Sequence, residues 1–230
     1  MNARARANAD SAPVNQTRAR LLATAARAFA ERGFHGVSMR DLARETGRSL
    51  GGFYNHFESK EALLFTLQRD AFDELLASAG RAIECATSAP AGLHLFVLNH
   101  LRYIASHPEV MRVLVHEAGA LEGSWRAEIR TRKEAYFDLA RGVIAGVVGG
   151  PDPLEIERVT YCVFGMLNWT YGWYVPEHHG PPEVLARTIH RVVIAGAAGD
   201  DASEDFYCAM AHHLDSVDTP PLIPTAEEMP

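Results

Sequence analysis

The stretch from Ser38 to Lys60 constrains the fold more than any other part of this chain. It reads SMRDLARETGRSLGGFYNHFESK and places three serines where helices would begin. A serine hydroxyl at a helix start accepts a hydrogen bond from a free backbone N–H, and Asp41 stands where it completes a capping box with Ser38. Gly47 allows the left-handed backbone that ends a helix. The stretch therefore predicts two short helices joined by a tight turn and the start of a third. This is a helix-turn-helix, whose second helix enters the major groove of DNA.

Together with the helix before it, this stretch resembles the DNA-binding domain of the TetR family of transcriptional repressors. The run Tyr-x-His-Phe-x-x-Lys-Glu that begins at Tyr54 stands in register with the Gly-x-Ser turn at Gly47, and the match covers about the first third of the chain. The resemblance implies a dimeric, one-component repressor that binds operator DNA. The matching residues are Ala25, Phe29, Gly33, Ser38, Asp41, Leu42, Ala43, Gly47, Ser49, Tyr54, His56, Phe57, Lys60, Glu61 and Leu63.

Charge is divided unevenly along the chain. The formal net charge is −7, but residues 1–65 hold ten Lys or Arg and six Asp or Glu, whereas the remainder holds twelve and twenty-three. A basic head on an acidic body suits a protein that touches phosphate with one end only. Chance asymmetry is the alternative interpretation of this split.

The composition narrows the class of protein. Hydrophobic residues make up 47% and charged residues 22% of the chain, as in an ordinary globular protein. There is no apolar run long enough to span a membrane and no secretory signal, so we expect a cytoplasmic protein. Cys85, Cys162 and Cys208 lie far apart, which argues against a zinc site or a disulfide framework. The sequence shows no phosphate loop, nucleophile elbow or metal-ligand cluster, so we expect no enzyme, no cofactor and no metal.

Helical periodicity runs through the rest of the chain, with no strand pattern and no internal repeat. It predicts an all-α fold, with an N-terminal three-helix helix-turn-helix domain and a larger helical domain for ligand binding and dimerisation. The predicted segments are a disordered arm at 1–14, the DNA-binding domain at 15–62, the ligand-binding and dimerisation domain at 63–213 and a flexible tail at 214–230. The predicted helices are 15–32, 39–46, 50–57, 59–86, 94–106, 109–118, 124–148, 153–175 and 183–198, with a short helix near 204–213.

Candidate DNA contacts lie on and beside the predicted recognition helix. Arg prefers guanine, Asn prefers adenine and an apolar side chain prefers the thymine methyl. By position, the base-reading candidates are Arg48, Leu50, Gly51 and Asn55. The resemblance implies that Tyr54, His56 and Lys60 hold phosphates, and Ser38 and Arg40 are further phosphate candidates. For Arg48 a solvated turn residue is an equal alternative. The whole candidate set is Ser38, Arg40, Arg48, Ser49, Leu50, Gly51, Tyr54, Asn55, His56 and Lys60.

The last two long helices each carry an apolar stripe that we interpret as a dimer interface, as the resemblance also implies. Two such helices from each subunit would form a four-helix bundle. The alternative is that both stripes belong to the core of a single chain. The interface candidates are Val163, Met166, Leu167, Thr170, Tyr174, Leu185, Ile189 and Val192.

The aromatic residues of the larger domain suggest a large apolar pocket for an effector. Each aromatic taken alone is more often plain core than ligand wall. The lining candidates are Phe96, Tyr103, Trp125, Tyr136, Phe137, Trp169 and Trp173.

The segment GMLNWTYGWYVPEHHGPPEVLARTI resembles a narrower subgroup, the TetR-type repressors of fatty-acid and steroid catabolism. That resemblance implies an acyl-CoA or related CoA thioester as the effector. Gly172 stands where a basic residue is common in the subgroup, so a phosphate contact at this position does not carry over. Arg102, Arg112, Arg130 and Arg132 are alternative anchors for an anionic group.

Three other interpretations compete with this one. The effector could be a non-CoA apolar or aromatic molecule, such as a drug or metabolite. The switch could be redox chemistry at Cys85 or Cys162, which loss of DNA release in a Cys→Ser variant would favour. An activator also fits, because the sign of regulation depends on where the operator lies.

Overall fold

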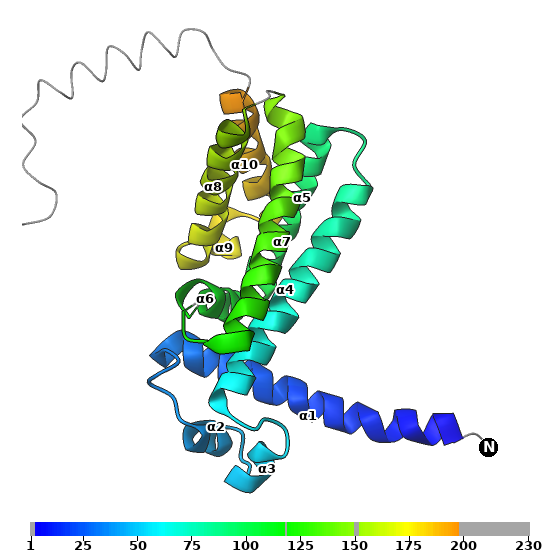
Figure 1. Cartoon of the computed structure of the whole chain (residues 1–230), viewed down its shortest axis with the longest axis vertical. Coiled ribbons are helices and arrows are strands. Elements are labelled where there is room, and N and C mark those ends of the chain that lie inside the picture. The colour runs from blue at the N-terminus through cyan, green and yellow to red at the C-terminus, as the bar shows by residue number, and fades with distance from the viewer. Residues whose placement is uncertain (1–2, 118, 150–151, 198–230) are drawn as a thin grey trace, which may run out of the picture.

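Every regular element in the described part of the chain is a helix, as the sequence predicted (Figure 1). The structure is a computed structural model that describes residues 3–117, 119–149 and 152–197. The elements are α1 (Ala3–Arg32), α2 (Met39–Glu45), α3 (Leu50–Tyr54), α4 (Lys60–Glu84), α5 (Ala89–Ser106), α6 (Pro108–His116), α7 (Gly123–Val148), α8 (Pro153–Trp169), the 3₁₀ helix η1 (Thr170–Gly172), α9 (Pro176–His179) and α10 (Pro182–Ala197).

The predicted caps form the helix-turn-helix. Ser38 caps α2, and the capping box with Asp41 is complete. Ser49 caps α3 by accepting from the Gly52 N–H. Gly47 has a φ of +68°, in the left-handed region that ends α2. Local side-chain chemistry therefore sets the boundaries of these short helices, which are too short to be stable alone.

The hydrophobic core joins α1, α2, α3 and the first turns of α4. Phe29, Leu42, Phe53 and Leu63 are each at most 2% exposed and occupy its centre. Phe53 and Phe57 are buried and point inward, which leaves the other face of α3 free. In Figure 1 these four helices form the lower end of the molecule, and α4 rises from it into the larger domain. The predicted boundary at residue 62 thus falls inside a continuous helix that both domains share.

Several predicted boundaries were wrong. α1 begins at Ala3 rather than at residue 15, so residues 3–14, predicted as a disordered arm, are helical. This segment contains five alanines and two arginines, which have high helix propensity. α5 begins at Ala89 rather than at residue 94, because Pro90 occupies a first-turn position that needs no N–H. The helix predicted near 204–213 and the tail predicted at 214–230, like Cys208, lie outside the described residues.

The recognition helix and the aromatic helix both end earlier than predicted. α3 ends at Tyr54 instead of residue 57, and two glycines in its five residues weaken it. α8 ends at Trp169 instead of residue 175, and the chain continues as η1 before the single turn of α9. The 153–175 segment, predicted as one helix, is therefore an α-helix followed by a short 3₁₀ helix and an irregular stretch.

The larger domain is a bundle around α4, α5 and α7. α5 packs against α4, α7 and α10, while α8 packs against α7. α6 lies across the base of the bundle and contacts α1, which connects the two domains a second time (Figure 1). Within the described ranges, no helix is both long and apolar enough to cross a membrane.

The turn between α1 and α2 generates the first prediction. A Cβ at Gly36 would collide with the carbonyl oxygen of Arg32, so Gly36→Ala should lower the free energy of unfolding by about 1–3 kcal/mol. Gly142→Ala is the matched control, because Gly142 is exposed in the middle of α7 and a Cβ there meets no atom within 4 Å. It should raise stability by up to about 1 kcal/mol. Chemical denaturation measures both, and equal stability of the two variants would contradict the prediction.

Candidate functional site

The exposed side of α3 and of the turn before it carries the base-reading candidates. Arg48, Gly51 and Asn55 are exposed, and Leu50 is half-buried. The Arg48 guanidinium donates to the Thr17 hydroxyl at 3.2 Å, which ties it to α1. An exposed hydrogen bond of this kind is weak and can be exchanged for one to DNA. These residues are accessible to DNA, and their base-reading role remains a prediction.

The phosphate candidates differ in how accessible their side chains are. Tyr54 is 47% exposed and Arg40 is exposed, so both side chains are accessible. Ser38, Arg40, Leu50, Tyr54 and Lys60 line one open groove between the α1–α2 turn, α3 and the start of α4. His56 lies beyond the end of α3 and is half-buried. Ser38 and Ser49 already use their hydroxyls as helix caps, so what they offer DNA is chiefly the free N–H groups of the helix start.

Lys60 has a structural role that the sequence did not reveal. Its ammonium donates to the carbonyl oxygens of Phe34 at 2.8 Å and Val37 at 2.9 Å. It also lies 4.2 Å from the centroid of the Phe34 ring, as a cation–π contact. An ammonium has three N–H donors, so one is left for a phosphate. Lys60 therefore holds the α1–α2 turn against α4, and any phosphate contact is additional.

The stripes predicted as a dimer interface are largely buried inside this chain. Val163, Leu167 and Thr170 are fully covered, and Tyr174 and Ile189 are at most 8% exposed. A partner cannot reach side chains that are already covered, so the intrachain alternative holds for these five. α8 packs chiefly against α7, and α10 packs chiefly against α5, so one side of each helix is covered within the bundle. Of the remaining candidates, Met166 and Leu185 are half-buried and Val192 is 55% exposed.

A different apolar face of α8 and α10 is exposed. Seven of the nine large hydrophobic side chains that are exposed in the described residues lie between Leu154 and Val192. On α8 they include Leu154, Tyr161 and Trp169, and the small residues Cys162 and Gly165 lie on the same face. Such a concentration of apolar surface marks an interaction site more often than chance exposure.

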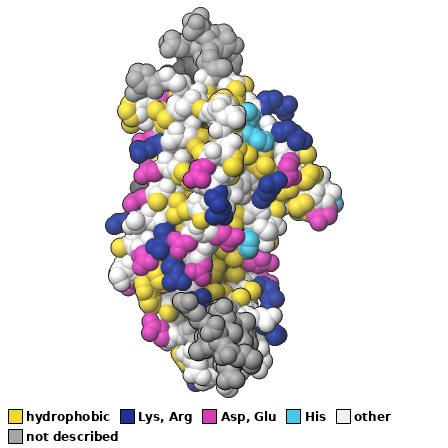
Figure 2. All heavy atoms as spheres, turned by 90° about the vertical axis from the view of Figure 1, so that its right-hand side faces the viewer, with side chains coloured by type: hydrophobic (Ala, Val, Ile, Leu, Met, Phe, Trp, Pro, Cys, Tyr) yellow, Lys and Arg dark blue, Asp and Glu magenta, His cyan; other side chains and the backbone are white. Residues whose placement is uncertain are grey.

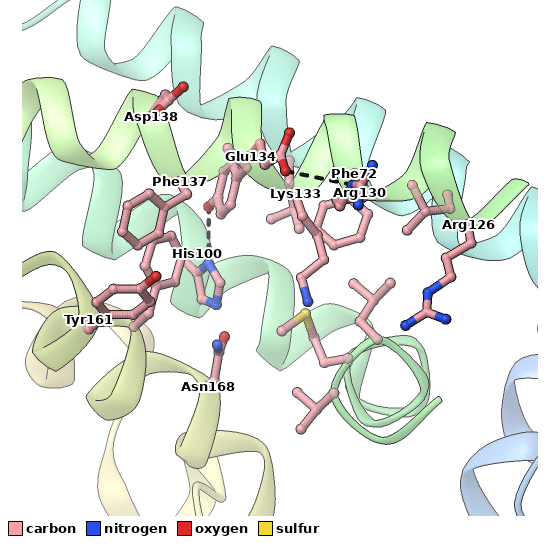
Figure 3. A pocket seen from close by; sticks show the side chains of 17 residues that line it. Phe72, His100, Arg126, Arg130, Lys133, Glu134, Phe137, Asp138, Tyr161 and Asn168 are labelled. Carbon is pink, nitrogen blue, oxygen red and sulfur yellow. Dashed lines mark hydrogen bonds and ion pairs between the residues drawn. The ribbon is translucent and has the colours of Figure 1, made fainter. Parts of the chain in front are cut away.

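The larger domain contains a cavity of about 840 Å³ between α4, α5, α6, α7 and α8 (Figure 3). Its volume lies within the range of small-molecule sites. In Figure 3 aromatic and apolar side chains surround His100 at one end of the cavity, here called the inner end, and Arg126 and Arg130 lie toward the opposite, outer end. Lys133 extends between the two ends, and Asp138 lies beyond Phe137 on the His100 side. The lining residues are Phe72, Leu75, His100, Met111, Leu114, Val115, Arg126, Ile129, Arg130, Lys133, Glu134, Tyr136, Phe137, Asp138, Tyr161, Phe164 and Asn168.

Two of the seven predicted lining residues, Tyr136 and Phe137, line this cavity. Phe96 and Tyr103 are buried core, and Trp125 stacks on Phe65 with ring centroids 5.5 Å apart. The other two predicted residues, Trp169 and Trp173, lie on the surface at 68% and 42% exposed. These five residues do not line the cavity because helical spacing only groups aromatic residues by helix face. The packing of the helices decides which face borders the empty volume.

His100 is the most unusual residue of the cavity wall. It is 2% exposed, its Nδ1 lies 3.0 Å from the Tyr136 hydroxyl, and its Nε2 has no hydrogen-bond partner. Burial lowers the pKa of His100 to about 4, and the Asn168 amide opposes this effect to a lesser extent. Burial also raises the pKa of Tyr136. Both groups are therefore neutral near pH 7. The only indication in the sequence is weak: a histidine on the apolar side of α5.

A basic strip borders the outer end of the cavity. Arg126, Arg130 and Lys133 are spaced by four and three residues on one face of α7, and Phe137 continues this face inward. Arg130 is 3.8 Å from Glu134 in an exposed ion pair, while in the described structure neither Arg126 nor Lys133 has an acidic partner within 4.0 Å. In Figure 3 the Lys133 side chain extends into the cavity. Spacing could have revealed this strip, of which the sequence analysis identified only Arg130.

The other arginines considered as anionic anchors are engaged elsewhere. Arg102 pairs with Glu183, and Arg132 pairs with Asp73. Arg112 lies over the Tyr171 ring. The face shown in Figure 2 mixes acidic and basic side chains, with no large area of one sign. The strip on α7 is thus the basic group that the fold places at the cavity.

Glu117 links the cavity to the DNA-binding domain. It follows α6, whose Met111, Leu114 and Val115 line the cavity. Its carboxylate accepts from the Phe34 N–H at 2.9 Å, and its backbone carbonyl accepts from the Gln68 amide at 3.1 Å. Phe34 also accepts the hydrogen bond from Lys60. A displacement of α6 would therefore act directly on the turn that holds the helix-turn-helix.

Both halves of the chain match models of known families. Residues 21–67 match the bacterial regulatory proteins of the tetR family, and residues 86–197 match the tetracyclin repressor-like C-terminal domain. The chain is 38% identical over 183 residues to the HTH-type transcriptional repressor KstR2 of Mycolicibacterium smegmatis. That alignment covers 76% of this chain and 88% of KstR2.

Solved structures share the fold. A TetR-family transcriptional regulator from Bordetella parapertussis superposes with a TM-score of 0.74 at 23% identity, over 77% of this chain and 93% of that one. AibR, solved in complex with isovaleryl coenzyme A and operator DNA, superposes with a TM-score of 0.67 at 24% identity, over 76% and 96% of the two chains.

The buried histidine predicts a pH dependence of stability. The unfolded chain protonates this imidazole as the pH falls through 6.5, whereas in the folded protein the pKa of His100 is about 4. The contribution is therefore complete above pH 6.5 and is lost between pH 6.5 and 4, to a limit of roughly 3 kcal/mol. Thermal unfolding should show a smaller loss over this range in His100→Gln than in the unaltered protein. Carboxylate titration is common to both proteins and cancels, so identical pH profiles would refute the assignment.

Proposed function

The chain belongs to the TetR family of transcriptional regulators, and we propose that it is a dimeric repressor that an anionic apolar effector releases from operator DNA. One observation carries the effector half of the proposal: a largely apolar cavity with a strip of three basic side chains at its outer end. An acyl-CoA thioester combines an apolar acyl group with several phosphates, so its two parts match the two ends of the cavity. AibR supports the class of ligand only by showing that this fold can hold a CoA thioester together with DNA.

The DNA half of the proposal rests on the free surface of α3. One short helix reads too few base pairs for useful specificity, so two copies are needed on a palindromic operator. Their recognition helices must lie about 34–36 Å apart, or a multiple of that distance, to enter successive major grooves. The exposed apolar face of α8 and α10 supports a dimer, since a second copy packed on it would remove this surface from water.

Effector binding would act through α6 and α4. Both helices line the cavity, α4 with Phe72 and Leu75 and α6 with Met111 and Leu114. Each is also joined to the α1–α2 turn, α4 by Lys60 and α6 by Glu117. A ligand that favours another placement of these helices changes the spacing of the two recognition helices. A coupling energy of about 1–3 kcal/mol is typical for such a switch.

The central test is a DNA-binding titration on the palindromic site nearest the gene, at one stated salt concentration. Saturated acyl-CoA thioesters should release the protein, whereas free CoA and the free acids should not. Lys133→Gln should raise the thioester concentration needed about tenfold, because it removes one charge-assisted hydrogen bond to phosphate. Arg81→Gln, an exposed position outside the cavity lining, is the charge-matched control.

The same titration distinguishes binding from coupling. Glu117→Ala should bind thioesters with unchanged affinity, measured by calorimetry, while release of DNA needs more ligand. Tight DNA binding that no thioester affects would eliminate the CoA ligand, keep the repressor and direct the search to uncharged apolar molecules. Release that is lost in Cys85→Ser or Cys162→Ser would instead favour the redox switch; both thiols are exposed.

Base reading and phosphate binding give different signatures in variants of α3. Asn55→Ala should relax the preference at one base-pair position and cost about 1–3 kcal/mol on the best site. Tyr54→Phe should weaken binding to all sequences alike, because a phosphate contact carries no sequence information. Binding to a library of operator variants measures both. An equal loss on every site for Asn55→Ala would remove its base-reading role.

The dimer face is tested by introducing a charge at its exposed edge. Val192→Asp should yield monomers in sedimentation velocity and lose operator binding, because a carboxylate cannot be buried without a partner. Ala77→Asp, exposed on α4 and away from this face, should remain a dimer. Dimers of unchanged stability in Val192→Asp would place the interface elsewhere.

A further inference from the structure

We infer that the inner end of the cavity is a carbonyl-binding subsite, formed by the His100–Tyr136 pair and Asn168, which selects effectors with a ketone or thioester oxygen at that depth. This rests on the proposed function in one respect, that the cavity is the effector site. It goes further by stating which chemical group the apolar part of the effector carries.

The direction of the His100–Tyr136 hydrogen bond determines what the cavity offers a ligand. A phenol is a better donor than acceptor, and the Tyr136 hydroxyl has no other partner among the described residues. We therefore assign the Tyr136 O–H as donor to His100 Nδ1, which lies 3.0 Å away. A neutral imidazole that accepts at Nδ1 carries its hydrogen on Nε2. The unpartnered Nε2 is consequently an N–H donor.

The surroundings of this donor are apolar on every side but one. The ring packs between Phe96, Tyr136 and Phe164, with centroid distances of 5.8–6.5 Å. On the remaining side Figure 3 shows the Asn168 amide, which lies close enough to oppose the lowering of the His100 pKa but makes no hydrogen bond to the ring within 3.5 Å. A buried N–H donor without an acceptor is unfavourable in free energy, because it has lost its hydrogen bond to water. A ligand oxygen between His100 and Asn168 would satisfy the donor and recover this free energy.

A carbonyl oxygen is the group that fits. It is an acceptor with two lone pairs, so it can take hydrogen bonds from the imidazole N–H and the Asn168 amide together. An ionised carboxylate would have to lose its hydration against three aromatic rings, with neutral partners only. Arg126 and Arg130 lie toward the other end of the cavity and Lys133 extends from that side into it, so charged groups of the effector belong there.

The test uses pairs of ligands that differ in one oxygen. Cyclohexanepropanoyl-CoA is compared with its ring ketone, and separately with the thioether analogue that lacks the thioester oxygen. Benzophenone and diphenylmethane form a third pair without CoA. Calorimetry or thermal shift gives the affinity ratio within each pair, for the full-length protein and for His100→Leu.

We expect the carbonyl compound of at least one pair to bind about tenfold more tightly to the unaltered protein, and this ratio to fall to about one in His100→Leu. A ratio that is confined to the ring ketone places a carbonyl of the acyl body in the subsite. A ratio that is confined to the thioester and thioether places the thioester oxygen there.

Three further variants guard against a purely structural effect. His100→Gln keeps an N–H donor of similar size and should retain part of the ratio. Tyr136→Phe frees the hydrogen to occupy Nδ1 and should reduce the ratio without changing the cavity volume. His116→Leu is the matched control, since the His116 Nε2 pairs with the Tyr171 hydroxyl at 2.6 Å on the surface; it should leave the ratio unchanged.

Failure of this inference differs from failure of the proposed function. Equal affinities within all three pairs, or equal ratios in the unaltered protein and His100→Leu, would overturn the carbonyl subsite even if thioesters release DNA. If no thioester binds but benzophenone is preferred over diphenylmethane in a His100-dependent manner, the subsite stands and the CoA effector is wrong.

Discussion

Two hydrogen bonds from the Lys60 ammonium to the carbonyls of Phe34 and Val37 hold the DNA-binding domain against the larger domain. They join the turn before the helix-turn-helix to the first residue of α4, the helix that continues into the ligand domain. Hydrogen bonds from a charged donor are worth about 1.5–3 kcal/mol each. The DNA-binding helices are short and cannot be stable alone, so this anchorage and the shared aromatic core hold them in place.

A second connection reaches the same turn from the opposite direction. The Glu117 carboxylate accepts from the N–H of Phe34, so one residue is bonded through its N–H to α6 and through its C=O to α4. Both helices border the cavity. This arrangement supplies a physical route for coupling, because a ligand that moves either helix changes the position of a single turn. Through α4 alone, a ligand could change only the tilt of this long helix.

The cavity combines two kinds of recognition at its two ends. At the outer end, exposed cations on α7 can attract an anionic group at little desolvation cost. At the inner end, neutral polar atoms of His100 and Asn168 stand among aromatic rings, where a hydrogen bond is stronger because water is excluded. Charge therefore favours the class of ligand, and the buried donor favours a particular group within that class.

Elements that depend on interactions between near neighbours in the chain could be predicted from the sequence. Ser38, Ser49 and Gly47 act within a few residues of their own position, so the caps and turn of the helix-turn-helix were predictable, as was the all-helical fold. Tertiary structure alone decided which helix faces are covered. Val163 and Leu167 proved to be core, Trp169 proved to be surface, and His100 and Lys133 became part of a cavity. Helical periodicity gives the direction of a side chain relative to its own helix axis, whereas burial depends on the other helices, and their packing is a property of the whole chain.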